Sequence, residues 1–173
     1  MNARGFAIFD TAIGACGIAW SDSGVVAVQL PERNEAATRA RLARRCAGAA
    51  ESPAPPDVRR AVDAIVSLLE GESTDLSFVP LDLDGVPGFH CRVYEVARTI
   101  PAGRTLSYGE IATRLGDPGA ARAVGQALGR NPVPIIVPCH RVLAAGGRTG
   151  GFSARGGTNT KLTLLAIEGA QLF

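Results

Sequence analysis

The chain has 173 residues, of which 46% are hydrophobic and 20% are charged, a composition typical of globular proteins rather than disordered or fibrous ones. No apolar run reaches the roughly 20 residues that cross a bilayer, and the N-terminus lacks the pattern of a secretory signal. We therefore expect a cytoplasmic protein with no membrane partner, built as one ordinary domain or two small ones.

The net charge of +2 conceals opposite charge balances in the two halves. Residues 1–87 carry 8 basic and 12 acidic side chains, whereas residues 88–173 carry 10 basic and 4 acidic ones. Because Arg and Lys that neutralise phosphates release counterions, the basic half favours a polyanionic partner. An ordinary solvated arginine surface is the alternative.

The cysteines are widely spaced and form no Cys-x-x-Cys pair, so neither a zinc ribbon nor a thioredoxin-like site is indicated. A disulfide framework is not expected in the cytoplasm. The spacing of Cys16, His90 and Cys91 in the chain does not indicate a metal site. We predict no metal and no other cofactor, and we interpret these residues, with Cys46, as structural.

The first half of the chain has the pattern of a small α/β domain. Three β-prone runs separated by turn residues predict an antiparallel meander: Phe6–Asp10, Ile13–Trp20 and Val25–Leu30. Helical apolar spacing follows on both sides of a proline-rich break, and one more strand is expected; these segments are Asn34–Ala47, Asp57–Leu69 and Phe78–Leu83. The arginines between residues 39 and 45 are interpreted as one solvated helix face.

The second half begins after the linker-like residues 85–88 and is mainly helical. A helix is predicted from Phe89 to Ile100. Ser107 then has the position of an N-cap for a helix over 108–115, with Glu110 placed for a capping box. A glycine-containing turn and a second helix over 120–129 complete a predicted helix-turn-helix.

This second helix has an unusually bare surface. Only Arg122 and Gln126 are long side chains, and the small ones are Ala120, Ala121, Ala123, Gly125, Ala127 and Gly129. Each glycine inside a helix costs about 1 kcal/mol relative to alanine. Either tight packing within the protein or close docking in a narrow groove can compensate, and the pattern fits a minor-groove binder better than a major-groove one.

A cysteine beside a histidine, Cys139-His140, is the best candidate for a reactive centre. Three prolines in residues 132–138 hold the backbone that leads to it in one path. A thiol attacks as thiolate, so it needs a base or a positive field, and His140, Arg141 and Glu168 are the candidate sources. Alternatively, Cys139 is a buried small hydrophobe.

The second half resembles the O6-alkylguanine-DNA alkyltransferase family. The resemblance rests on three segments, Ile100–Ala112, Ala121–Gly125 and Asn131–Val142. It implies a ribonuclease-H-like α/β N-terminal domain over 1–84, with a small antiparallel sheet and helices. It also implies a mainly α, winged-helix-like C-terminal domain with a helix-turn-helix over 85–173. The N-terminal half is similar only by position and pattern.

The resemblance implies direct, irreversible DNA repair in which each molecule acts once as a methylated-DNA--protein-cysteine methyltransferase. The implied partner is double-stranded DNA containing O6-alkylguanine or O4-alkylthymine, bound in the minor groove by a monomer. Cys139 would accept the alkyl group. His140, through a bound water, would draw off the thiol proton while Glu168 orients the imidazole, and Asn131 would fix the turn that carries the cysteine.

By the same resemblance Tyr108 presses on the target phosphate, which rotates the nucleotide outward, and donates a hydrogen bond near guanine N3. A base inside a duplex cannot be reached for in-line attack, so this flipping is also a chemical requirement. The implied stack-filling side chain is Arg122. The other implied DNA contacts are Ala121, Ala123, Gly125 and Gln126, and the implied substrate pocket is Phe152, Ser153, Gly156, Val142 and Pro134.

The chain departs from the common family pattern in the loop after the nucleophile. Phe152 stands where tyrosine is usual, and the path to Lys161 is longer, so the preferred lesion size stays open. Tyr94 replaces a common tryptophan, a change that we expect core packing to absorb. The alternative functions are an alkyltransferase-like protein that binds lesions without transfer, a transcription regulator and a cysteine hydrolase; relatives of the first kind typically lack the cysteine.

Overall fold

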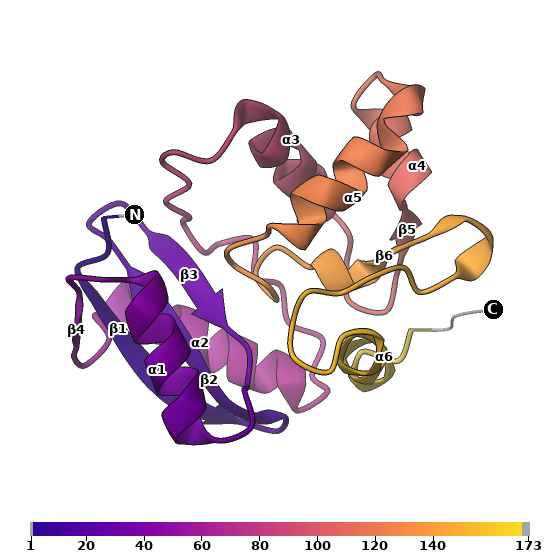
Figure 1. Ribbon diagram of the computed structural model, residues 1–173. Coiled ribbons are helices and arrows are strands. Elements are labelled where there is room, and N and C mark those ends of the chain that lie inside the picture. The colour runs from indigo at the N-terminus through magenta and orange to yellow at the C-terminus, as the bar shows by residue number, and fades with distance from the viewer. Residues whose placement is uncertain (1, 171–173) are drawn as a thin grey trace. The chain divides into compact units, whose positions relative to one another are not determined.

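The computed structural model describes residues 2–170, which group into two compact units (Figure 1). The N-terminal unit comprises Met1–Gly85 together with Pro132–Ile136. The C-terminal unit comprises Val86–Asn131 and Val137–Phe173. None of the described helices is both long and apolar enough to cross a membrane.

The N-terminal unit is built on a four-stranded sheet in the order β3-β2-β1-β4. Strands β1 (Gly5–Thr11), β2 (Gly14–Trp20) and β3 (Val25–Gln29) pair antiparallel, which confirms the predicted meander. The sheet as a whole is mixed, not antiparallel, because β4 (Ala50–Glu51) pairs parallel with β1. A two-residue strand is too short to produce a recognisable alternation in the sequence.

The prediction of a strand over residues 78–83 is wrong. This segment makes only an isolated bridge between Val25 and Leu81. The Val25 N–H donates to the Pro80 carbonyl at 2.9 Å, and the Asp82 N–H donates to the Val25 carbonyl at 2.9 Å. Since Pro80 has no N–H to give to a ladder, the pairing stops there.

Two helices cover the sheet, α1 (Glu35–Arg45) and α2 (Pro56–Leu69). In Figure 1, α1 lies in front of the strands and α2 behind them. The Asn34 side chain caps α1 by accepting from the Ala37 N–H at 2.8 Å. The α1 side buries an apolar cluster that comprises Phe6, Ala19, Val26, Ala27, Leu42 and Cys46.

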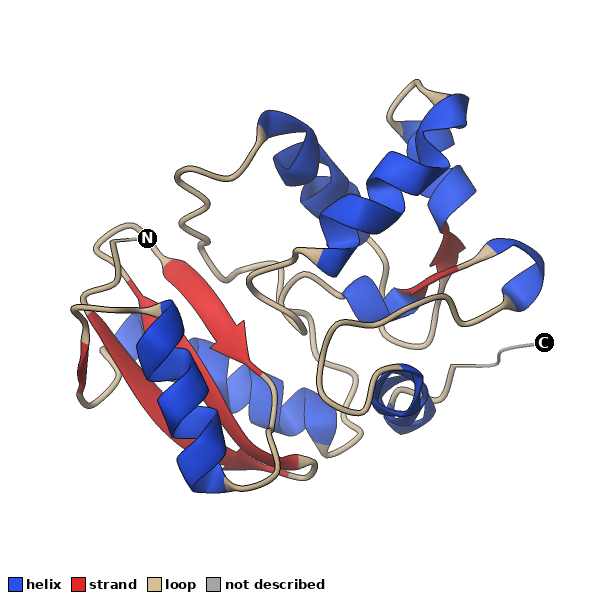
Figure 2. Ribbon diagram, viewed as in Figure 1, coloured by secondary structure: helices blue, strands red, loops and turns tan. Residues whose placement is uncertain are grey.

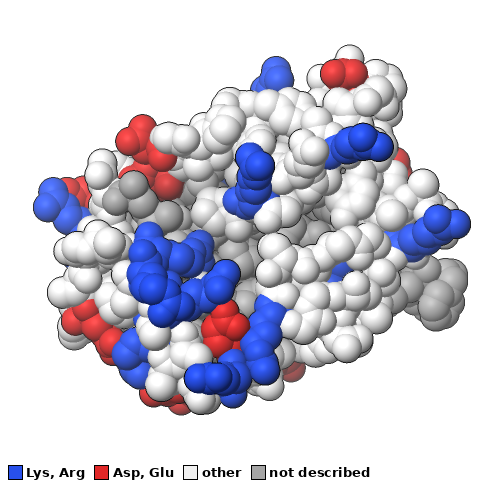
Figure 3. All heavy atoms as spheres, viewed as in Figure 1, with Lys and Arg blue, Asp and Glu red and all other residues white. Residues whose placement is uncertain are grey.

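The arginines of α1 are not simply a solvated face. Figure 3 shows basic side chains gathered near this helix, but several are compensated locally. Arg39 pairs with Glu35 and Glu51, and Arg41 pairs with Glu32. Arg45 is half-buried and donates to the carbonyl oxygens of Val28 and Pro132 and to the Gln29 side chain. The sequence could not reveal these partners because they come from other segments.

The C-terminal unit is mainly helical, as predicted (Figure 2). Its helices are α3 (Gly88–Ala97), α4 (Tyr108–Arg114), α5 (Ala121–Gly129) and α6 (Thr158–Ile167), with short 3-10 turns at Pro118–Ala120, Cys139–Arg141 and Ala145–Gly147. The capping box is confirmed: Glu110 N–H donates to Ser107 Oγ at 3.0 Å, and Ser107 N–H donates to Glu110 Oε1 at 3.2 Å.

Two short strands bring distant parts of this unit together. β5 (Leu106–Ser107) pairs parallel with β6 (Val142–Leu143), with Leu106 opposite Val142 and Ser107 opposite Leu143. Tyr108 directly follows β5, and the Cys139–Arg141 turn directly precedes β6. The pairing therefore fixes the start of α4 relative to the segment that carries the cysteine.

Candidate active site

Cys139 opens a 3-10 turn and is only 7% exposed. Burial raises the pKa of its thiol, while a hydrogen bond from Asn131, the charge of Lys161 and neighbouring backbone amides lower it. Asn131 Nδ2 also donates to the Val137 carbonyl at 2.9 Å, which closes the path between residues 131 and 137. A thiol in this position is held in place and protonated at rest unless a base removes its proton.

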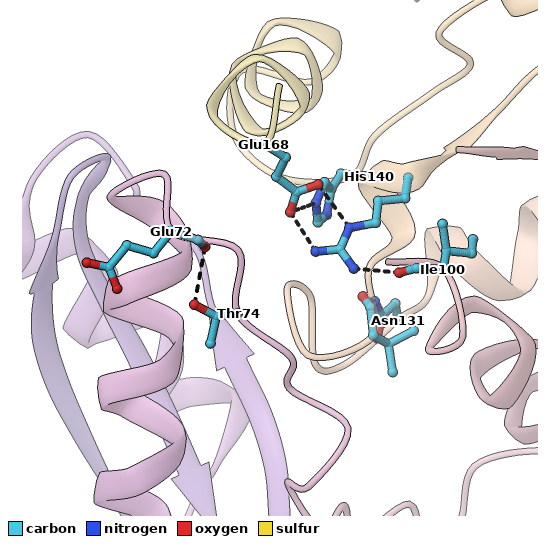
Figure 4. Close-up of polar contacts among 8 residues, drawn as sticks. Glu72, Thr74, Ile100, Asn131, His140 and Glu168 are labelled. Carbon is cyan, nitrogen blue, oxygen red and sulfur yellow. Dashed lines mark hydrogen bonds and ion pairs between the residues drawn. The ribbon is translucent and has the colours of Figure 1, made fainter. Parts of the chain in front are cut away.

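His140 is fully buried and is the candidate for such a base. Its Nε2 lies 3.0 Å from Glu168 Oε2, and in Figure 4 the two side chains point toward one another. Burial lowers the pKa of His140, although the hydrogen bond and charge of Glu168 act in the opposite direction, so the ring is neutral near pH 7. Among the described residues, His140 Nδ1 has no hydrogen-bond partner. With Nε2–H donated to Glu168, Nδ1 carries a free lone pair.

Glu168 lies at the C-cap of α6 and is held by Arg141, which the sequence had indicated only as a possible source of base or positive field for the thiolate. Arg141 Nε donates to Oε1 at 2.9 Å, and Arg141 Nη2 donates to Oε2 at 2.6 Å. Burial alone raises the pKa of Glu168, but the hydrogen bonds of Arg141 and His140 bring it down to about 2. Glu168 is therefore a carboxylate at every physiological pH.

Tyr108 is the first residue of α4, and its ring is half-buried. Burial, followed by the nearby Cys139, raises the pKa of its hydroxyl, so the group stays a proton donor. Gly150 passes close to it: a Cβ there would lie 2.6 Å from the Tyr108 hydroxyl oxygen, and its φ of +68° suits glycine. The loop after the nucleophile is thus shaped around Tyr108.

An apolar groove joins the thiol to the bare helix. Its lining residues come from α4, α5, the cysteine turn and the following loop: Ser107, Tyr108, Gly109, Ala121, Arg122, Gly125, Gln126, Leu128, Gly129, Cys139, Ala144, Ala145, Gly151, Phe152 and Ser153. The predicted residues Cys139, Tyr108 and Arg122 therefore share one surface with Phe152 and Ser153. His140, Glu168 and Asn131 do not line the groove.

Four predicted contacts are placed elsewhere. Val142 is fully buried in β6, and Ala123 and Gly156 are not among the lining residues. Pro134 belongs to the N-terminal unit. The DNA contact of Ala123 and the pocket roles of Val142, Gly156 and Pro134 stay predictions.

The two glycines of α5 are not needed for packing within the C-terminal unit. A Cβ at Gly125 would meet only the Tyr108 ring, at 4.0 Å, and a Cβ at Gly129 would meet nothing within 4 Å. The helix packs instead through its buried residues Val124, Ala127 and Leu128. Of the two explanations left open by the sequence, close docking of an external partner is therefore the better supported.

Lys161 is a second functional candidate that the sequence analysis missed. It is 0% exposed, and its Nζ lies 3.5 Å from the Tyr108 hydroxyl, 3.4 Å from the Gly151 carbonyl and 5.7 Å from the Tyr108 ring centre. Burial lowers its pKa to about 8, against a raising effect of Cys139. A signal was available: Lys161 shares a helical face with Leu164 and Leu165, both of which are buried.

The metal-ligating side chains of residues 2–170 are scattered. Within this range, no group of three or more His, Cys, Asp or Glu side chains is arranged to hold a metal ion. The chemistry available at the site is that of a thiol, a neutral imidazole oriented by a carboxylate, and a tyrosine hydroxyl beside a buried amine. This set suits nucleophilic attack by sulfur in a pocket that opens onto a groove.

Comparison with known proteins agrees with this chemistry. Residues 88–170 match the family model described as "6-O-methylguanine DNA methyltransferase, DNA binding domain". A methylated-DNA--protein-cysteine methyltransferase of Mycobacterium tuberculosis is 50% identical over 117 residues, which is 68% of this chain and 68% of the relative. One from Methanothermobacter thermautotrophicus is 35% identical over 156 residues, 90% of this chain and 80% of the relative.

The fold has solved counterparts as well. The crystal structure of Mycobacterium tuberculosis OGT in complex with DNA superposes with a TM-score of 0.76 at 37% identity, covering 95% of this chain and 92% of that one. Sequence and fold thus agree over nearly the whole length. The chain belongs to the methylated-DNA--protein-cysteine methyltransferase family.

Proposed function

We propose that the protein repairs DNA by moving an alkyl group from O6 of guanine, or O4 of thymine, onto Cys139 Sγ. The observation that carries this function is that Cys139 lines a groove and is followed in the chain by a neutral imidazole that a carboxylate orients. A hydrolytic role requires turnover, whereas a thioether on Cys139 has no leaving group and ends the reaction. The protein therefore acts once.

The proposed transfer balances as follows. The Cys139 thiol gives its proton through a water molecule to His140 Nδ1, and Glu168 stabilises the resulting imidazolium. The thiolate attacks the alkyl carbon, an S–C bond forms, and the C–O6 bond breaks with its electron pair kept by guanine. Tyr108 donates a hydrogen bond at guanine N3, where negative charge develops. The proton lost by sulfur replaces the alkyl group on guanine.

The partner is double-stranded DNA that contains O6-alkylguanine. We propose that α5 enters the minor groove with its small residues, Ala121, Ala123 and Gly125. Gln126 of the same helix also contacts the DNA. Arg122 is exposed near the start of this helix and fills the gap that the flipped nucleotide leaves. Tyr108 presses on the target phosphate, and Phe152 and Ser153, which line the groove, contact the flipped base.

Finer features of the fold are also proposals. The mixed sheet with helices on both faces supports a ribonuclease-H-like N-terminal domain over 1–84. The helix pair α4–α5, followed by β6, supports a winged-helix-like C-terminal domain over 85–173. The short segment 132–136 groups with the first unit despite its position in the chain. We further propose a monomer that works in the cytoplasm, where DNA and a reduced Cys139 thiol meet.

The test is to incubate the protein with duplex DNA carrying O6-methylguanine and to locate the methyl group by peptide mass spectrometry. The expected product carries one methyl group on Cys139 and none elsewhere. Cys139→Ala should bind the lesion without transfer, while the matched control Cys91→Ala should transfer normally. An unmodified Cys139 in a protein that binds the lesion tightly would show instead a lesion-binding protein without transferase activity.

A further inference from the structure

Arg141 uses every edge of its guanidinium within the C-terminal unit. Besides its two bonds to Glu168, it donates from Nη1 to the Ile100 carbonyl at 2.7 Å, and the residue is only 6% exposed. In Figure 4, the dashed lines for these bonds end at Glu168 on one side and at Ile100 on the other. The guanidinium is therefore anchored on one side by backbone and presents its planar fork to the carboxylate on the other.

This fork determines how Glu168 meets His140. Both carboxylate oxygens accept from Arg141, which fixes the plane of the carboxylate, and Oε2 also lies 3.0 Å from His140 Nε2. A carboxylate only accepts hydrogen bonds, so the contact requires a proton on Nε2. A protonated Glu168, in contrast, donates a hydrogen bond to Nε2, so the single ring proton then lies on Nδ1. In that tautomer Nδ1 has no free lone pair to accept the thiol proton.

The charges that face His140 agree with this geometry. Glu168 is the only anion described as acting on the ring, and the cations Arg141 and Lys161 both disfavour a second proton on it. Burial has the same effect and is the larger cause. The ring next to Cys139 is therefore neutral, and which nitrogen carries its single proton is decided at Glu168.

We propose that Arg141 is the positioning residue that keeps Glu168 an acceptor, and thereby holds the His140 proton on Nε2 and the Nδ1 lone pair free. This role rests on the proposed function, because it concerns the base that deprotonates Cys139. Arg141 touches neither substrate nor thiol proton. It acts through Glu168, in the way that a buried carboxylate partner sets the tautomer of a catalytic imidazole.

The first test needs no change at Arg141. Heteronuclear NMR of the imidazole nitrogens reports which one is protonated, and the chain has two histidines, so a His90→Gln sample assigns the signals. The expected wild-type spectrum shows His140 protonated at Nε2 at neutral pH. A proton on Nδ1 overturns the proposal. This readout stands even if the protein transfers no alkyl group, a result that would remove the proposed function alone.

The second test compares Arg141→Gln, Arg141→Lys and the exposed control Arg114→Gln by single-turnover rates on O6-methylguanine duplex, from about pH 6 to about pH 9. With Arg141→Gln the buried Glu168 takes up a proton, so the rate at about pH 6 should fall by roughly 100-fold and recover in part as pH rises. Arg141→Lys keeps the charge and should keep the wild-type pH dependence with a smaller loss, and Arg114→Gln should match the wild type.

A purely structural Arg141 predicts a different pattern. In that case Arg141→Gln lowers the melting temperature and the amount of active protein but leaves the pH dependence and the His140 tautomer unchanged, which overturns the proposal. If Arg141→Gln does not fold, the His140 tautomer of the wild type and the pH profile of Arg141→Lys still test the proposal. A lysine variant whose acidic limb shifts to higher pH despite the retained charge also counts against the proposal.

Discussion

The Tyr94 hydroxyl donates a 2.6 Å hydrogen bond to the Ala127 carbonyl and so joins α3 to α5. Tyr94 is 1% exposed, so the ring is absorbed by core packing as expected for a residue that replaces tryptophan. The hydroxyl adds a hydrogen bond between the two helices that core packing alone does not predict. This hydrogen bond holds α5, the helix whose outer face lines the groove, against α3.

Tyr94→Phe should therefore destabilise the protein by about 1 kcal/mol, the usual net value of one buried hydrogen bond. The loss stays at this level because the Ala127 carbonyl still accepts from the Arg130 N–H at 3.2 Å and is not left unpaired. Equilibrium unfolding in urea measures the effect as a lower midpoint with an unchanged slope. A midpoint equal to that of the wild type would mean that the hydroxyl contributes nothing to stability.

Gly125→Ala should raise stability and lower repair at the same time. The new methyl group meets only the Tyr108 ring at 4.0 Å, and alanine favours a helix over glycine by about 1 kcal/mol. The same methyl group thickens the face that we propose docks on DNA, so affinity for duplex DNA should fall. Thermal melting and a DNA-binding titration check the two effects.

Gly88→Ala is the matched control, because a Cβ there meets nothing within 4 Å and the residue lies outside the groove. It should leave DNA affinity unchanged. If Gly125→Ala instead binds DNA as tightly as the wild type, the bare surface of α5 has a purpose other than close docking.

Arg122→Ala should slow repair of O6-methylguanine in duplex DNA far more than the reaction with free O6-benzylguanine. Only the duplex reaction needs a side chain in the gap left by the flipped nucleotide, and a lost intercalating contact costs a few kcal/mol. Rates of Cys139 alkylation on the two substrates measure the difference. Arg130→Ala, an exposed arginine just beyond α5 that does not line the groove, is the control. Equal losses on both substrates would remove the stack-filling role.

The sequence predicted those parts of the C-terminal unit that depend only on residues close together in the chain. The Ser107–Glu110 capping box and the helix pair were recognisable because each needs only a few neighbouring residues. The Cys139-His140 pair itself indicated a reactive centre, and the family resemblance assigned the separate roles of Cys139, His140 and Glu168. Local rules failed for β4, β5 and β6, since two-residue strands show no periodicity.

The roles of Arg141 and Lys161 were not predicted for a different reason. Charged side chains are usually solvated, so a sequence pattern assigns them to the surface unless a partner is known. The partner of Arg141 lies 27 residues away in the chain, and the hydroxyl next to Lys161 lies 53 residues away. Only the folded chain brings these groups together.

Lys161 should leave a signature in the pH dependence of stability. Its pKa is about 8 in the folded protein against 10.5 for an ordinary lysine, so between these values the unfolded chain binds a proton that the folded protein does not. Stability due to Lys161 therefore rises with pH across this window, by on the order of 1 kcal/mol per pH unit. Below about pH 8 both states are protonated, and the contribution is a constant cost.

The measurement is the free energy of unfolding of the wild type minus that of Lys161→Met, followed from about pH 7 to about pH 10. The difference is needed because Cys139, Cys16 and Tyr94 have raised pKa values, and their loss of protons on unfolding lowers stability over the same range. The difference should grow with pH above about 8. Thr163→Met, an exposed change on the same helix, should give a difference that is flat with pH, and a flat result for Lys161→Met would show that its amine is solvated.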